Sequence, residues 1–156
     1  MSAHLRNQIR DAVVSLLRGA RLTGARVYPT RRFPLQPEHL PALLVYTLAE
    51  DAGPETIGSP RFLSRDLDLV IEGVAQDNDT LDGLLDSLAD VIETRLGAAL
   101  EEPASALRGL VRTGALQRTE IVVRPPQQPD EAGTGHIVLT YRVNYRTRSN
   151  DPKLNT

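Results

Sequence analysis

The chain contains no cysteine, a single lysine and few aromatic residues. Without cysteine it can form neither a disulfide framework nor a thiolate zinc site, and we expect it inside the cell, where disulfides are rare. The one lysine, Lys153, leaves arginine as the main cation. The shortage of aromatic rings disfavours a reader of single-stranded nucleic acid, because such proteins stack bases on exposed rings.

Long apolar runs are also missing. No stretch approaches the roughly 18 apolar residues that span a bilayer, and the N-terminus, MSAHLRNQIRDAVV, mixes charges into its apolar positions. We therefore expect neither a signal peptide nor a membrane anchor. The length of 156 residues predicts one domain, 1–156, and the polar C-terminus predicts a loose tail over about residues 147–156.

Charge is segregated along the chain, although the net charge is only −2. Residues 1–32 contain seven arginines and one acid, Asp11. Residues 66–93 contain nine carboxylates and neither lysine nor arginine. The small net charge by itself indicates no nucleic-acid or membrane partner, so the segregation is more informative than the total.

Two segments have the periodicity of amphipathic helices. In residues 4–19, HLRNQIRDAVVSLLRG, apolar residues recur at intervals of three and four and form one stripe. Residues 77–100, DNDTLDGLLDSLADVIETRLGAAL, repeat the pattern, with Asp79 as the expected N-cap and Asp82 in the first turn. The leucines of this second helix share one side and its acids another, so we expect the leucines to face a sheet.

Strands are predicted at residues 25–29, 41–50, 65–75, 115–124 and 136–146. In RDLDLVIEGVA and HIVLTYRVNYR, apolar and polar residues alternate, which is typical of a strand with one covered face. The order of helix, strands, helix and strands, with hairpin-like connections, predicts an α+β fold. This fold is a mainly antiparallel sheet with two helices packed on one face.

Two long loops are expected, DAGPETIGSPRF at residues 51–62 and PPQQPDEAGTG at residues 125–135. Each joins two predicted strands and is longer than the usual hairpin turn of about two to five residues. Loops of this length inside a compact domain are typical of functional or disordered segments.

Asp66, Asp68 and Glu72 raise the question of a metal site, because all three lie on one face of a predicted strand. Asp66 and Asp68 would lie about 7 Å apart, whereas Glu72 would lie about 20 Å from Asp66 and cannot join them. No histidine lies at a ligand spacing from another. We therefore predict no metal site and no cofactor, and interpret the acids as a solvated or interface-forming strand face.

Motifs for covalent or phosphate chemistry are not found. No glycine-rich phosphate loop with lysine occurs, and IGSPR lacks the second glycine of a nucleophile elbow. The histidines have no partner at a spacing that indicates a general base. We predict no catalytic residue and no enzyme activity.

Asp82, Asp86 and Asp90 follow one another at intervals of four residues on the second helix. Like charges at this spacing cost roughly 0.2–0.5 kcal/mol per pair on an isolated helix. Three explanations stay open: screening by water and salt, arginines of the first helix in the same molecule, or arginines of another molecule. Arg142 and Arg146, on the polar side of the last strand, leave the same choice between solvated surface and subunit contact.

In the order of these features, the chain resembles the tail terminator family of long-tailed bacteriophages, also called minor tail protein U. The resemblance runs from Leu5 to Arg146. It rests on LRNQIRDAVVSLL, LPALLVYTLAEDAGPET, SRDLDLVIEGVAQDNDTLDGLLDSLADVIE and GHIVLTYRVNYR. Extra residues around EEPASALRGLV depart from the family pattern.

The resemblance implies a structural virion protein without catalysis or cofactors. It implies a homohexameric ring that stops polymerisation of the tail tube at the end nearest the capsid and offers a surface to the head-side connector. The expected partners are copies of the same chain, the tail-tube protein and the connector protein, with DNA only as cargo and no membrane. The expected location is the virion tail, and the host cytoplasm during assembly.

On this reading the charged residues become assembly candidates, because segments of opposite charge can pair head to tail and close a ring. The subunit-interface or lumen candidates are Asp66, Asp68, Glu72, Asp82, Asp86, Asp90, Arg6, Arg10, Arg142 and Arg146. The candidates for docking tube or connector from the two loops are Glu55, Arg61, Gln127, Asp130 and Glu131. Two rival functions stay open: another neck component, such as a tail-completion or head-tail joining protein, and a metal-dependent hydrolase using Asp66 and Asp68.

Overall fold

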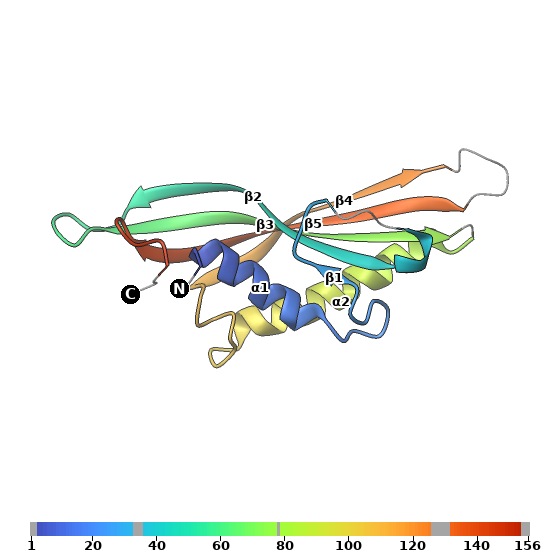
Figure 1. Cartoon of the computed structure of the whole chain (residues 1–156), viewed down its shortest axis with the longest axis horizontal. Helices are drawn as coiled ribbons and strands as arrows, with labels where there is room; N and C mark the ends of the chain where they lie inside the picture. The colour runs from blue at the N-terminus through green and yellow to red at the C-terminus, as the bar shows by residue number, and fades with distance from the viewer. Residues whose placement is uncertain (1–2, 33–35, 78, 126–131, 154–156) are drawn as a thin grey trace.

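The computed structural model describes residues 3–32, 36–77, 79–125 and 132–153. The helices are α1 (Leu5–Leu17) and α2 (Leu81–Glu101), with a short 3-10 helix η1 (Pro37–His39). The strands are β1 (Val27–Tyr28), β2 (Ala42–Pro54), β3 (Phe62–Asp77), β4 (Thr113–Arg124) and β5 (Gly133–Arg148). Figure 1 shows one long, twisted sheet with both helices beneath it.

The sheet has the strand order β1-β2-β3-β5-β4. The pairs β2–β3, β3–β5 and β5–β4 are antiparallel, and only the short β1 runs parallel to its neighbour β2. Both helices pack on the same face of the sheet, α1 chiefly against β2 and α2 against β3 and β5 (Figure 1). The predicted α+β fold, with a mainly antiparallel sheet and two helices on one face, is confirmed.

The alternation of apolar and polar residues along the two central strands, β3 and β5, creates the core. Leu67, Leu69 and Ile71 of β3 are fully buried on the helix-covered face, and Tyr141, Val143 and Tyr145 of β5 lie there as well. The helices contribute the apolar stripes that their periodicity predicts. Their buried residues are Leu5, Ile9, Val13, Val14 and Leu17 of α1, and Leu81, Leu85, Leu88, Ala89, Ile92, Leu96, Ala99 and Leu100 of α2.

Three glycines allow α2 to lie close to the sheet. A Cβ atom added at Gly135 would lie 2.8 Å from a methyl carbon of Leu85, and one at Gly114 would lie 2.9 Å from a methyl carbon of Leu100. At Gly73 the nearest α2 atom, on Leu88, would lie at 3.2 Å. The absence of side chains at these positions therefore sets the distance between helix and sheet.

The N-cap was predicted for α2 alone, and it differs in the structure. The side chain of His4 caps α1 by accepting a hydrogen bond from the backbone N–H of Arg6 at 3.1 Å. For α2, the predicted N-cap Asp79 is wrong, because the N-cap residue is Thr80. The Thr80 hydroxyl donates to the Asp77 carboxylate, so the acid that supports this terminus lies before the cap.

Several strands are longer than predicted. Pairing of β2 with β3 continues to Pro54 and Leu63, so the loop expected at residues 51–62 contains only residues 55–61. The expected loose tail, residues 147–156, also differs in its described part. Thr147 is buried in β5, which continues to Arg148, and the backbone N–H of Leu5 donates to the Pro152 carbonyl at 2.9 Å, so Pro152 is held against the start of α1.

Candidate functional site

The face of the sheet opposite the helices, here called the open face, carries most of the predicted charged residues. Asp66, Asp68 and Glu72 lie on it because they alternate with the buried leucines and isoleucine of β3. The register of β5 places Arg142 beside Asp68 and Asn144 beside Asp66. Acids on one strand therefore meet donors on the next, an arrangement that favours cross-strand pairing.

Arg142 joins two acids from two strands. Its Nη1 lies 2.8 Å from Asp68 of β3, and its Nη2 lies 2.6 Å from Asp51, at the far end of β2. The hydrogen bonds that Arg142 donates to Asp51 and Asp68 raise its pKa above the ordinary value. The side chain spans β3, so its positive charge is largely neutralised within the subunit.

A second cluster surrounds Asn144. Its amide donates to Asp66 and to the Ser64 hydroxyl, both at 2.9 Å, and its oxygen accepts from Arg112 at 2.9 Å. Arg112 also binds Glu55 at 2.7 Å, and this hydrogen bond lowers the pKa of Glu55. The cluster thus connects the start of β4 to the end of the β2–β3 hairpin.

Arg146 lies next to this cluster, above the side chain of Phe62. The guanidinium carbon is 3.7 Å from the centre of the Phe62 ring, and the Nε atom is 3.4 Å from the Glu55 carboxylate. A guanidinium stacked on an aromatic face at this distance is held by a cation–π interaction. Like Arg142, Arg146 is therefore already engaged inside the subunit.

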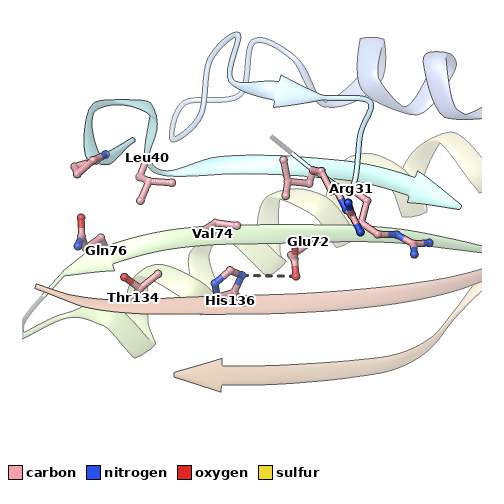
Figure 2. Close-up of a pocket in the computed structure, with 10 residues that line it drawn as sticks. Arg31, Leu40, Glu72, Val74, Gln76, Thr134 and His136 are labelled. Atoms are coloured by element: carbon pink, nitrogen blue, oxygen red, sulfur yellow. Dashed lines mark ion pairs between the residues drawn. The ribbon is translucent and has the colours of Figure 1, made fainter. Parts of the chain in front are cut away.

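A hollow of about 470 Å³ lies on the open face nearer the β1 edge. Figure 2 shows Glu72 and His136 facing each other across β3 and β5, with 3.6 Å between the carboxylate and Nδ1. Arg31 reaches over from the segment after β1, and its guanidinium lies 4.9 Å from the Tyr46 ring centre. The hollow holds one carboxylate and one imidazole, too few ligands for a metal centre of the usual kinds.

These contacts separate the three acids that suggested a metal site. Asp66 accepts from Asn144, Asp68 pairs with Arg142, and Glu72 faces His136. Within residues 3–32, 36–77, 79–125 and 132–153, no group of three His, Cys, Asp or Glu side chains could hold a metal ion. The open face consequently presents mixed and mostly paired charge.

The covered side of the sheet contains a polar cluster that sequence reasoning missed. The Glu50 carboxylate binds Arg6 of α1 at 2.7 Å and Arg65 of β3 at 3.0 Å, and it accepts from the Tyr145 hydroxyl. Arg65 also donates to the Thr147 hydroxyl at 2.9 Å. Burial, followed by the bond to Glu50, raises the pKa of Tyr145. The interface candidate Arg6 therefore anchors α1 to the sheet.

Asp82, Asp86 and Asp90 behave differently from the acids of β3. All three are exposed on α2, and no ion pair of the described residues includes any of them. Of the three explanations for this row, pairing with the arginines of α1 in the same molecule is not observed in the described structure. Solvent screening and a second molecule remain.

The basic N-terminal segment is likewise short of acidic partners. Among the described ion pairs, Arg6 is the one arginine of this segment that pairs with a carboxylate. Arg18 and Arg26 donate to the carbonyls of Val27 and Pro41 instead, and the Nε atom of Arg10 is buried without a hydrogen-bond partner. Most of the positive charge of this segment is not neutralised within the described structure.

The edges of the sheet expose apolar side chains. On β4, which ends the strand order, Ile121, Val122 and Val123 are exposed by 54%, 46% and 48%. On β2, Leu48 is exposed by 58% beside an irregularity in its pairing with β3. Exposed apolar residues on an unpaired strand edge are typical of a surface that pairs with another chain.

The loop candidates are only partly described. Glu55 begins the β2–β3 turn and binds Arg112, whereas Arg61, at the end of the turn, is exposed and uses its backbone carbonyl to accept from Ser149. Ile57 between them is fully exposed. Gln127, Asp130 and Glu131 lie outside the described residues. No helix in the described ranges is both long and apolar enough to cross a membrane.

Comparisons with known proteins identify a shared fold. No protein-family model matches this chain, and no curated protein matches its sequence. Among solved structures, the chain is similar to a chain in the virion of a native gene transfer agent particle, with a TM-score of 0.51 and 21% sequence identity. The similarity covers 86% of this chain and 92% of that chain. At this identity the likeness shows the fold alone.

Proposed function

We propose that this chain is a structural protein of a phage-like virion. The observation that carries the proposal is the likeness of its fold, over most of both chains, to a chain of a gene transfer agent virion. The order of elements that resembles the tail terminator family points in the same direction. The geometry is compatible with this role, since the charged residues of the open face are engaged in cross-strand pairs.

Within that class, the role we propose is that of a tail terminator. Copies of the chain form a ring of six at the capsid-proximal end of the tail tube, stop its polymerisation and present a surface to the connector. DNA passes through the ring as cargo. The unpaired acids of α2 and the unneutralised arginines near the N-terminus support self-assembly, because opposite patches on identical copies make head-to-tail contacts that can close.

The β2–β3 turn is the described candidate for docking the tube or the connector. Ile57 at its tip is fully exposed, and Arg61 is exposed beside it. Figure 1 shows this turn projecting beyond the sheet at the end opposite the C-terminal end of β4. A projecting turn on a rigid sheet suits recognition of a neighbouring ring.

The first experiment is assembly with tail-tube subunits. We expect the purified chain, mass 17.1 kDa, to appear in native mass spectra as a ring of six copies, and to limit the length of tubes when added to polymerising subunits. Tubes of unrestricted length beside an intact ring would contradict the terminator role and favour another neck component. Metal-dependent hydrolysis of a substrate by a monomer or dimer would contradict the structural role altogether.

A further inference from the structure

The outer edge of β4 has no strand beside it in the described sheet. β4 is 12 residues long and is the last strand in the sheet order. Near its C-terminal end, Ile121, Val122 and Val123 are each about half exposed. Soluble proteins usually protect such edges with lysine, proline or short length. Here the sequence from Thr119 to Val123 has neither lysine nor proline, and its one charged residue, Glu120, pairs with Arg118 of the same strand.

The opposite edge of the sheet is also largely free. β1 pairs with β2 only at Leu43 and Leu44, so the outer side of β2 from Tyr46 to Pro54 has no strand beside it among the described residues. Leu48 is exposed there, and the Thr47 carbonyl accepts a hydrogen bond from the side chain of Arg31 at 3.1 Å. A side chain substitutes at this point for a missing backbone partner.

Strand directions make the two edges compatible. Three successive antiparallel pairings connect β2 through β3 and β5 to β4, so β4 runs antiparallel to β2. A second copy placed beside the first, with its helices on the same side, would therefore set its β2 antiparallel to β4 of the first. Repetition of this step continues one sheet through all copies and leaves no free edge once a ring closes.

Charge on the helix side matches the same arrangement. The hollow between α2 and β4 is lined by Glu93 and Leu116, and Asp82 lies near Val123, so the acidic side of α2 borders the β4 edge. α1 borders the other edge, because Arg6 binds Glu50 of β2. Arg10, one turn further along α1, has no acidic partner among the described residues.

We propose that β4 of one copy pairs with the free part of β2 of the next copy, and that Asp82, Asp86 and Asp90 of the first face α1 of the second. The occupant of the β4 edge is thus a second copy of this chain. This contact depends on the proposed function only for the number of copies that assemble. Within one copy Val122 is level with Ala42 of β2, so the contact brings the exposed apolar residues of β4 to Leu48 only when the second copy is shifted along the strand direction. It also places the unpaired acids beside the unneutralised arginines.

The test blocks one edge at a time with Val122→Lys on β4 and Leu48→Lys on β2. Lysine on an edge strand opposes pairing. We expect each variant alone to associate at least about tenfold more weakly than the wild type in sedimentation equilibrium, a loss of about 1.4 kcal/mol. Mixed together, the variants should form one-to-one dimers and nothing larger, because one intact β4 edge and one intact β2 edge remain.

Ala98→Lys is the matched control, since it adds the same charge at an exposed position of α2 and should assemble like the wild type. If Val122→Lys fails to fold by circular dichroism, Val123→Lys blocks the same edge from the other face. The proposal is overturned by a wild-type chain that stays monomeric at high concentration, by full assembly of the β4 variant, or by a mixture without dimers. Loss of tube-length control by a chain that still assembles would instead count against the terminator role.

Discussion

At the scale of residues, Glu50 holds together parts of the chain that are distant in sequence. Its side chain is 11% exposed and contacts Arg6 of α1, Arg65 of β3 and Tyr145 of β5. A partly buried carboxylate with two cationic partners is satisfied only while both partners stay in place. The open-face pair between Glu55 and Arg112 has similar chemistry but greater exposure, 31% and 42%.

The same substitution at the two glutamates should therefore change the free energy of unfolding by different amounts. We expect Glu50→Gln to lower the free energy of unfolding by about 2–4 kcal/mol, because the largely covered Arg65, 12% exposed, loses its counter-charge. Glu55→Gln should change it far less, because exposed ion pairs contribute little. Urea denaturation followed by circular dichroism measures both values. Equal effects of the two substitutions would show that Glu50 does not anchor α1.

At the scale of elements, the packing of α2 on the sheet depends on missing side chains as much as on leucines. Gly135 and Gly114 lie under α2 with no space for a methyl group, since a Cβ atom would lie within 3 Å of neighbouring side chains. Gly97, on α2 itself, has nothing within 4 Å of its would-be Cβ atom. Glycine therefore permits close packing where it lies on a strand, whereas within the helix it only lowers the helix propensity.

Alanine substitutions at these glycines should have opposite signs. Gly135→Ala forces Leu85 or α2 to move and should destabilise the protein by about 1–3 kcal/mol. Gly97→Ala should stabilise it by about 0.5–1 kcal/mol, because alanine is the better helix former. Thermal unfolding of the two variants beside the wild type tests the sign. Stabilisation by Gly135→Ala would mean that α2 does not lie as close to β5 as described.

At the scale of the whole molecule, the two lateral edges of the subunit carry opposite charges. The acids of α2 border β4, whereas the arginines of α1 and its following segment border β1 and β2. A net charge of −2 conceals this asymmetry. Identical copies with opposite sides of this kind attract each other side by side and repel each other in reversed orientation.

Self-association should consequently weaken with salt. The screening length falls from about 10 Å at 0.1 M to about 3 Å at 1 M ionic strength, which removes most of the attraction between exposed charges. We expect the association constant of the wild type to fall across this range. The triple variant Asp82→Asn, Asp86→Asn, Asp90→Asn should associate more weakly at low salt and respond less to it. A salt-independent wild type would contradict a charge-guided contact.

Local patterns in the sequence were sufficient for the helices, the central strands and the face that each strand buries. The alternation of Leu67, Leu69 and Ile71 with acids predicted the covered face of β3, and the stripe of α2 predicted its buried leucines. Strand ends and the N-cap of α2 were wrong, because pairing with a neighbour extended β2 and β5 beyond their local signals. The role of the charged interface candidates in assembly remains a prediction.

The sequence by itself determined the α+β class and the two oppositely charged segments, because both depend on the spacing of residue types along the chain. Only the tertiary structure decided which charges meet. Arg142 and Asp68 are far apart in the chain and became partners through the register of β5 with β3, while Asp82, Asp86 and Asp90 stayed unpaired on the exposed side of α2. Pairing of this kind is set by long-range strand register, which no local pattern encodes.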